Sequence, residues 1–168
     1  MTEHLKDEQL ERLVPYSFKK STHKLPFRRR GPRLQGAVLQ HGIPAQDGEI
    51  FNLVFESANS DWEQSVTLVT DKTVRIGQKV YKKGVIVPYD SSRQLLPIVV
   101  GTREGMLWVW NSWQYRDISG ILRRMSQLNY AGMMVDKFPN GFRYRCNEGR
   151  DDDDYDDLVF RIEKTRPF

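Results

Sequence analysis

The sequence predicts an α+β fold: a mainly antiparallel β-sheet, arranged as a sandwich or an open barrel, with one amphipathic helix near residues 117–128. Short apolar runs follow one another along the chain with the period-two alternation of strands. Two connections, Gly77–Gln78 and Asn140–Gly141, contain glycine where a tight β-hairpin needs it. Only one interior stretch has helical spacing, so parallel strand-helix-strand units are not expected.

The N-terminal part of the chain forms a separate predicted unit. Residues 2–13 predict a short helix with a threonine cap, which Pro15 ends. Residues 16–33 lack periodicity and are punctuated by proline and glycine, so we expect an extended arm. The predicted domains are therefore residues 1–33, a helix and a basic arm, and residues 34–168, a single β-rich globular domain.

The globular domain is predicted to begin with a series of strands. They cover residues 34–40, 50–56, 62–70, 73–76, 79–82 and 85–87. A type II′ turn at Gly77–Gln78 joins two of them, and Lys83–Gly84 is predicted to reverse the chain before the last. Residues 95–100 and 106–110 are apolar on both faces, which predicts the buried centre of the sheet.

Residues 117–128 predict the amphipathic helix, with Asp117 as its N-terminal cap. Its apolar side chains recur at helical spacing, at Ile118, Ile121, Leu122, Met125 and Leu128. A hairpin is expected next, in which residues 133–137 and 142–147 flank the Asn-Gly turn. Residues 158–162 predict the last strand.

Length and composition are typical of a soluble protein with one core. The 168 residues are 39% hydrophobic and 29% charged, and no stretch reaches the apolar length of a membrane span. Residues 1–13 are too polar for the core of a signal peptide. Cys146 is the only cysteine, which excludes an internal disulfide and a cysteine-based zinc site. We expect no membrane partner and an intracellular, reducing compartment, either the cytoplasm or an assembled particle.

Charge is distributed unevenly along the chain. No acidic residue occurs between Val14 and Gln46, and seven cationic residues lie there: Lys19, Lys20, Lys24, Arg28, Arg29, Arg30 and Arg33. The chain has 26 Lys and Arg against 22 Asp and Glu, so without these seven (26 − 7) the balance is 19 against 22. All of the positive excess lies in the arm, which favours a polyanionic partner or an acidic protein surface.

The residue types of the arm suit two functions. As an assembly arm it would dock on neighbouring subunits, with Phe18 and Phe27 in apolar pockets; as a nucleic-acid tether its cations would contact DNA or RNA phosphates. The interleaved aromatic residues favour assembly, although a solvated tail is a third interpretation. The sequence predicts a non-enzymatic structural or assembly subunit of a larger complex, for example a virion or phage particle, that forms a homo-oligomer or a larger assembly. A sequence-nonspecific nucleic-acid-binding protein is the first alternative.

A second charge cluster is acidic and contains Asp151, Asp152, Asp153, Asp154, Asp156 and Asp157. Such runs favour a solvated loop, and pairing with the arm of another copy is the next interpretation. A calcium loop is disfavoured because Asp157 stands where the sharp turn needs glycine. A Mg²⁺-dependent nuclease that uses Glu148, Asp151 and Asp154 of the 148–157 cluster is the second alternative function.

Common catalytic signatures are missing from the sequence, among them phosphate-binding loops, dinucleotide-binding glycines and metalloprotease histidine pairs. The three histidines, His4, His23 and His41, lack the paired spacing of a metal site or a catalytic triad. We therefore expect no catalytic residue, no metal site and no cofactor.

Aromatic residues cluster near the centre of the predicted sheet, at Trp108, Trp110, Trp113 and Tyr115. With the nearby arginines, Arg116, Arg123 and Arg124, they suit the stacking of single-stranded nucleic acid. Their position in the most apolar strand favours core packing over ligand stacking. Arg143 and Arg145 are expected on the solvent face of an edge strand, where charge preserves solubility.

Overall fold

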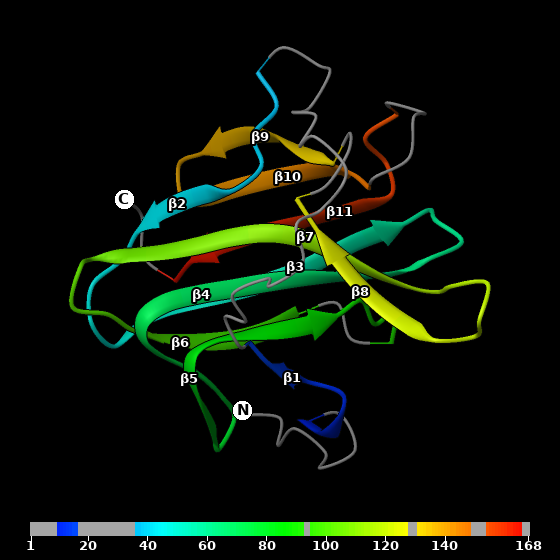
Figure 1. Cartoon of the computed structure of the whole chain (residues 1–168). Coiled ribbons are helices and arrows are strands. Elements are labelled where there is room, and N and C mark those ends of the chain that lie inside the picture. Colours follow the sequence, from blue (N-terminus) through cyan, green and yellow to red (C-terminus); the bar gives the residue numbers. More distant parts are fainter. Residues whose placement is uncertain (1–9, 17–35, 93–94, 128–130, 149–153, 166–168) are drawn as a thin grey trace.

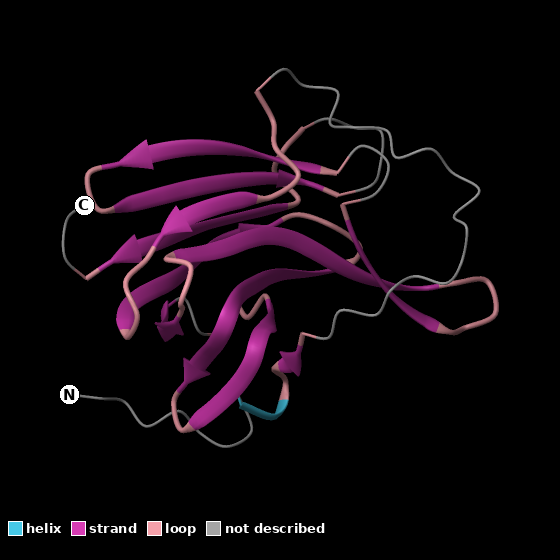
Figure 2. Ribbon diagram, turned by 60° about the vertical axis from the view of Figure 1, so that its left-hand side comes forward, coloured by secondary structure: helices cyan, strands magenta, loops and turns pink. Residues whose placement is uncertain are grey.

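The computed structural model describes residues 10–16, 36–92, 95–127, 131–148 and 154–165, and it is nearly all antiparallel β-sheet (Figure 1, Figure 2). Its strands are β1 (Val14–Pro15), β2 (His41–Pro44), β3 (Glu49–Ala58), β4 (Glu63–Ile76), β5 (Lys79–Pro88), β6 (Leu95–Gly101), β7 (Met106–Arg116), β8 (Leu122–Ser126), β9 (Gly132–Phe138), β10 (Gly141–Asn147) and β11 (Leu158–Lys164). The β-rich part of the predicted fold class is confirmed, and its helical part is wrong.

Neither predicted helix is present in the described part of the chain. Residues 2–9 of the first predicted helix lie outside the described residues; helical geometry covers Leu10 and Glu11, and the chain then enters β1, where Val14 pairs with Ile86 of β5. The other predicted helix, 117–128, is a turn followed by β8, which pairs with β7. Backbone pairing with a neighbouring strand therefore overrides the local helical spacing of apolar residues.

The architecture is one sheet folded over on itself along a single line, which we call the crease. The pairing of β2 with β7 is continued by the pairing of β3 with β6, with a shift of register across the connections 45–48 and 102–105. At the same level β4 pairs with β7 before a bulge at 70–72 and with β6 after it. The β4–β5 pairing is shifted there too, opposite Lys83. Bending at one level turns these strands through the crease, at the left of Figure 1.

The two halves of the folded sheet meet again at their free edges. One half contains β2, β7 and β8 with the first part of β4, and the other contains β6, β3, β11, β10 and β9. Val38, just before β2, bridges Met133 of β9 through backbone hydrogen bonds of 2.9 and 2.8 Å. The predicted choice between a sandwich and an open barrel is thus resolved as a folded sheet whose free edges are joined by one isolated bridge in the described chain.

The core lies between the two halves and is fully apolar at its centre. Phe51, Leu53 and Phe160 are buried there, and the rings of Tyr144 and Phe160 stack with centroids 4.6 Å apart. A hydrogen bond of 2.9 Å joins Nδ1 of His41 to the hydroxyl of Tyr144. Burial lowers the pKa of His41 and raises that of Tyr144. This histidine is therefore a half-buried, hydrogen-bonded residue that packs against the core through Tyr144 and Phe142.

Both predicted hairpins are confirmed. β4 and β5 pair from Ile76 and Lys79 outward, and the positive φ of Gly77 (58°) matches the first position of the predicted turn. β9 and β10 flank the Asn-Gly turn as predicted. The predicted chain reversal at Lys83–Gly84 is wrong, because β5 runs through it without interruption. Lys83 has a φ of 64°, since it lies opposite the β4 bulge at the crease.

The outer face of the second half carries a ladder of ion pairs. Arg143 and Arg161 both contact Glu56, and Arg145 contacts Asp136 at 3.7 Å. Hydrogen bonding to Glu56 raises the pKa of Arg143. The predicted edge-strand position of Arg143 and Arg145 is wrong, because β10 lies between β9 and β11.

Within the described residues, no helix is long and apolar enough to cross a bilayer.

Candidate functional site

The most prominent feature of the surface is the hairpin formed by β7 and β8. It projects beyond the neighbouring strands at the end opposite the crease, which we call the hairpin end (Figure 1, Figure 2). Its register runs from Ser112 opposite Ser126 to Arg116 opposite Leu122. Residues 117–121 form the turn that connects the strands. The hairpin thus presents a narrow tip to its surroundings.

Asp117 organises the turn. Its Oδ1 accepts hydrogen bonds from the backbone N–H groups of Ser119 (2.9 Å) and Ile121 (3.0 Å), and its Oδ2 accepts one from Nε of Arg123 (3.0 Å). The bond from Arg123, followed by the bond from Ile121, lowers the pKa of Asp117. Gly120 has a φ of 76°, a conformation that few other residues adopt without strain. Asp117 was predicted as a helix cap and instead caps a β-turn, for which the same side chain is suited.

The tip of the hairpin is apolar and exposed. Ile118 has a relative exposure of 108%, and Ile121 and Leu122 are 51% and 50% exposed. Arg116, which is also exposed, donates a hydrogen bond of 3.0 Å to the carbonyl oxygen of Gly120. These aliphatic side chains add no burial to the core, so we interpret them as a contact surface.

Arginines flank the tip on both faces of the hairpin. Arg123 faces the same side as Tyr115, its cross-strand partner, and Arg124 faces the same side as its partner Gln114. Arg124 donates a hydrogen bond of 2.7 Å to Oε1 of Gln114. Each guanidinium carries five donors, so one internal contact leaves several N–H groups for a partner. The hairpin therefore combines an apolar tip with positive charge.

A stack of aromatic rings supports the base of the hairpin. Trp62, which immediately precedes β4, lies nearly parallel to Trp113, with centroids 6.5 Å apart and planes at 12°, and 5.2 Å from the ring of Tyr115. Trp113 is only 2% exposed, whereas Trp62 and Tyr115 are half-buried. The prediction of core packing thus holds for Trp113, and it also holds for Trp110, which is 7% exposed; Trp108 is 36% exposed.

Beneath this stack lies a buried polar cluster centred on Glu148. Oε2 of Glu148 accepts hydrogen bonds from the hydroxyl of Ser60 and from Nε2 of Gln64 (2.8 Å), and its backbone N–H donates to Oδ2 of Asp157 (2.7 Å). Glu148, Gln64 and Asp157 are each at most 2% exposed. The cluster ties the β3–β4 connection to the segments that flank β10 and β11. Its carboxylates are engaged in support of the fold.

The predicted acidic cluster is divided by the structure. Asp151, Asp152 and Asp153 lie outside the described residues. Carboxylate oxygens of Asp154, Asp156 and Asp157 lie within 4.8 Å of one another. Asn59 joins this segment to the β3–β4 connection, since its Nδ2 donates to Asp156 (2.8 Å) and its N–H to the carbonyl oxygen of Asp157 (3.0 Å). Of the acids in the nuclease alternative, Glu148 is buried in the polar cluster and Asp154 is exposed.

The exposed acids of these two connections form what we call the acidic rim. It comprises Asp61, Asp154 and Asp156, of which the first two are exposed and the third is half-buried. The rim lies at the hairpin end, because the connections that carry it follow β3 and precede β11 there (Figure 1). One end of the molecule therefore carries both a positive protrusion and a negative rim.

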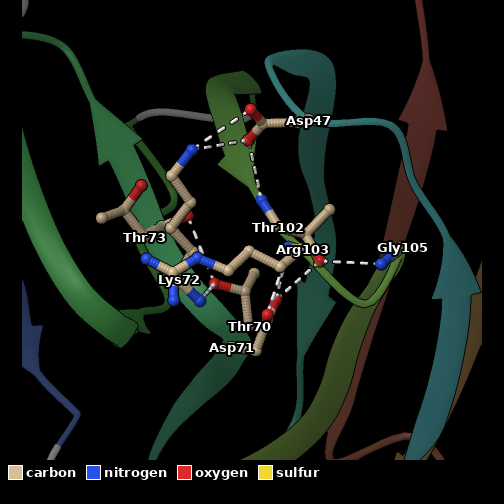
Figure 3. A network of polar contacts seen from close by, with 8 residues as sticks. All are labelled: Asp47, Thr70, Asp71, Lys72, Thr73, Thr102, Arg103 and Gly105. Carbon is tan, nitrogen blue, oxygen red and sulfur yellow. Dashed lines mark hydrogen bonds and ion pairs between the residues drawn. The ribbon is translucent and has the colours of Figure 1, made fainter.

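Carboxylates at the crease end have a different environment, shown in Figure 3. Asp47, in the β2–β3 connection, accepts hydrogen bonds from the N–H of Thr102 (3.0 Å) and from Nζ of Lys72 (3.1 and 3.2 Å). Asp71, in the β4 bulge, accepts bonds from the hydroxyl of Thr102 (2.8 Å) and the N–H of Arg103 (2.9 Å). The network therefore joins the three connections that make the crease.

Thr102 is the centre of that network and is 5% exposed. Its Oγ1 donates to Asp71 and accepts hydrogen bonds from the N–H groups of Gly105 (3.0 Å) and Met106 (3.3 Å). The N–H of Thr102 is the principal cause of the lowered pKa of Asp47. Partial desolvation raises the pKa of Asp71, but hydrogen bonds, first those from Arg103 and Thr102 and then those from the backbone N–H groups of Glu104 and Asp71, lower it overall. We assign this network to the bending of the sheet.

The other predicted site residues lie outside the described part of the chain. These are the cations Lys19, Lys20, Lys24, Arg28, Arg29, Arg30 and Arg33 and the aromatic residues Phe18 and Phe27. The residues on either side of them are described. Tyr16 donates its N–H to the carbonyl oxygen of Gly84 (3.0 Å) and packs edge-on against Trp110, and Val38 bridges Met133. The described residues on either side of the basic segment, Tyr16 and Val38, are thus attached to the globular domain.

Comparison of the chain with protein families, with curated proteins and with solved structures finds no match. The candidate site therefore rests on the geometry of the hairpin end. Sequence reasoning missed its tip, although a signal was present. Tyr115, Asp117, Arg123 and Met125 alternate about an Asp-x-Ser-Gly turn, a pattern that also suits a hairpin.

Proposed function

We propose that this protein is a non-enzymatic subunit of a larger assembly, which docks on other molecules through the β7–β8 hairpin and the basic segment 16–33. The observation that carries the proposal is the exposure of Ile118, Ile121 and Leu122 on a turn that hydrogen bonds hold in one conformation. Leaving large aliphatic side chains in water gains nothing for the fold of the monomer. Burial in an interface recovers that free energy, at about 25 cal/mol per Å².

The basic segment supports the same function. It contains all of the positive excess of the chain, and the described residues on either side of it, Tyr16 and Val38, are hydrogen-bonded to the sheet. Deleting residues 1–33 would remove β1 as well, so the cleaner perturbation replaces the seven cations by glutamine. In the proposed assembly these cations contact acidic surfaces of neighbouring subunits.

Size-exclusion chromatography with light scattering tests the role of the hairpin. The variant combines Ile118→Ser, Ile121→Ser and Leu122→Ser, and the control combines Ile50→Ser, Val80→Ser and Leu95→Ser, which are 44%, 59% and 49% exposed elsewhere on the surface. We expect the hairpin variant to lose association that the wild type and the control retain, with an unchanged circular dichroism spectrum. Association of the hairpin variant equal to that of the wild type, or a wild type that binds neither itself nor nucleic acid, would contradict the proposal.

A second candidate function is sequence-nonspecific binding of single-stranded nucleic acid. The half-buried rings of Trp62 and Tyr115 lie beside Arg123, and base stacking on aromatic side chains is tolerant of sequence. Fluorescence anisotropy with labelled single-stranded DNA and RNA, over a range of salt concentrations, tests this function. Binding should weaken steeply with salt and should be lost in the variant without the seven cations. An affinity for nucleic acid that changes neither with salt nor with the seven substitutions would contradict this second function.

A further inference from the structure

We propose that the β7–β8 hairpin of one molecule docks on the acidic rim of a second copy of the same chain, and that a two-fold axis makes the contact reciprocal. This inference rests on the proposed docking function and names its partner. Because hairpin and rim lie at the same end, two molecules that face each other can form both contacts at once (Figure 1). Such an isologous contact closes as a dimer.

Charge complementarity carries the inference. The hairpin, residues 112–126, contains three arginines and a single acidic residue, Asp117, which Arg123 already neutralises. The rim contributes Asp61, Asp154 and Asp156. Arginine and carboxylate groups pair with two parallel hydrogen bonds when their geometry allows, which adds orientation to attraction. The two surfaces therefore match in sign, and hydrogen bonds to the backbone or to neighbouring side chains hold both in place.

The apolar tip also finds a complementary surface beside the rim. Trp62 directly follows Asp61 in the chain, and its ring is half-buried against Tyr115 and Trp113. An aromatic ring next to a carboxylate matches an aliphatic tip next to arginines, because each apolar group meets an apolar group and each charge meets its opposite. We expect Ile118 of one copy to pack against Trp62 of the other.

Edge-to-edge pairing of β8 with a second β8 is the competing arrangement between copies. In the described chain β8 pairs with β7 alone, so its outer edge is available in principle. Antiparallel pairing across a two-fold axis at the centre of β8 would place Arg124 of one copy directly opposite Arg124 of the other. Like charges directly opposite on neighbouring strands are destabilising. The hairpin-to-rim arrangement avoids that repulsion.

A charge-swap experiment tests the inference on the full chain. One variant combines Arg116→Glu and Arg124→Glu, which leaves the Asp117–Arg123 contact of the turn intact; the other combines Asp61→Lys and Asp154→Lys. The mass of each is measured by light scattering, alone and as an equimolar mixture. Each variant alone brings like charges together, so we expect the dissociation constant of its dimer to rise by about a hundredfold. In the mixture both contacts have opposite charges, and the dimer should return.

Three outcomes overturn the inference: a wild type that stays monomeric, variants that dimerise as the wild type does, or a mixture that stays monomeric while both variants retain the wild-type circular dichroism spectrum. The serine variant of the tip distinguishes this failure from failure of the proposed function. If that variant loses self-association and the charge swap does not restore it, docking through the hairpin stands and the acidic rim is the wrong surface of the second copy. Nucleic acid that co-elutes with the wild type but not with the arginine variant would identify the other class of partner.

Discussion

At the crease end, the carboxylates of Asp47 and Asp71 accept hydrogen bonds from backbone N–H groups and from Thr102. Their negative charge is therefore stabilised by groups of the same sheet. At the hairpin end, Arg116, Arg123 and Arg124 are exposed, and large aliphatic side chains stand in solvent beside them. The difference separates polar residues that shape the sheet from residues available to a partner. Residue type alone does not make this distinction, because aspartate occurs at both ends.

The largest loss of stability is expected from the buried polar cluster at the hairpin end. It tests whether buried residues there support the fold, in contrast to the exposed residues of the hairpin. Glu148→Leu removes the acceptor for the half-buried hydroxyl of Ser60 and for the buried Nε2 of Gln64, at about 1–3 kcal/mol each. We expect a loss of about 3 kcal/mol in the free energy of unfolding, measured by urea denaturation. Under the same conditions, Gln64→Glu should also lower the free energy of unfolding, because it places a second carboxylate beside Glu148. Stability equal to wild type in both variants would show that the cluster is not structural.

A smaller loss is expected at the crease, where Thr102→Val keeps the shape of the side chain and removes the hydroxyl. The bonds to Asp71, Gly105 and Met106 are lost, so we expect a decrease of about 2 kcal/mol in the free energy of unfolding. The matched control is Ser119→Ala in the exposed hairpin turn, which should change stability by less than about 0.5 kcal/mol. Equal effects of the two substitutions would remove the contrast between the ends.

The dependence of stability on pH in the acid range tests the role of the carboxylates at the crease. The pKa values of Asp47 and Asp71 are lowered from 3.8 in the fold, so the unfolded chain takes up protons more readily than the folded chain. Their stabilisation is therefore present above the unfolded pKa and is lost as the pH falls through the folded values. The variant with Asp47→Asn and Asp71→Asn should have a flatter thermal stability profile below pH 3.8 than the wild type. Parallel profiles would mean that these carboxylates do not contribute.

The smallest global effect is expected from Asp117→Ala. The turn loses its acceptor for Ser119, Ile121 and Arg123, but few core contacts depend on it. Amide hydrogen exchange should accelerate in residues 112–126 and stay at wild-type rates in β4 and β5, because local opening of the hairpin leaves the folded sheet intact. Self-association should weaken with it, since a loosened tip must be ordered again on binding. Faster exchange throughout the sheet would show that the hairpin is part of the core.

Much of the sheet could be predicted because the alternation of apolar and polar residues marks the strands within short stretches of sequence. The β4–β5 and β9–β10 hairpins follow from Gly77 and the Asn140–Gly141 turn. The apolar runs near β6 and β7 do form strands, but the prediction that both of their faces are buried is wrong, because Leu95 is 49% exposed and Trp108 is 36% exposed. The helix near 117–128 was a wrong prediction, because Ile118, Ile121 and Leu122 satisfy helical spacing while they project from a turn. Short windows of apolar residues fit both periods, and pairing with β7 decides between them.

By itself, the sequence determined that the chain would form antiparallel strands around an apolar core and that its positive excess would lie in one segment, since both depend on residue order alone. Only the tertiary structure decided where the sheet folds over and that residues 112–126 form a protruding hairpin. It also decided which carboxylates accept hydrogen bonds from backbone N–H groups. These features depend on contacts between residues far apart in the chain, such as Asp47 with Thr102 and Ser60 with Glu148. Local periodicity reports which side chains are apolar, whereas burial and charge pairing are fixed by what long-range strand pairing brings together.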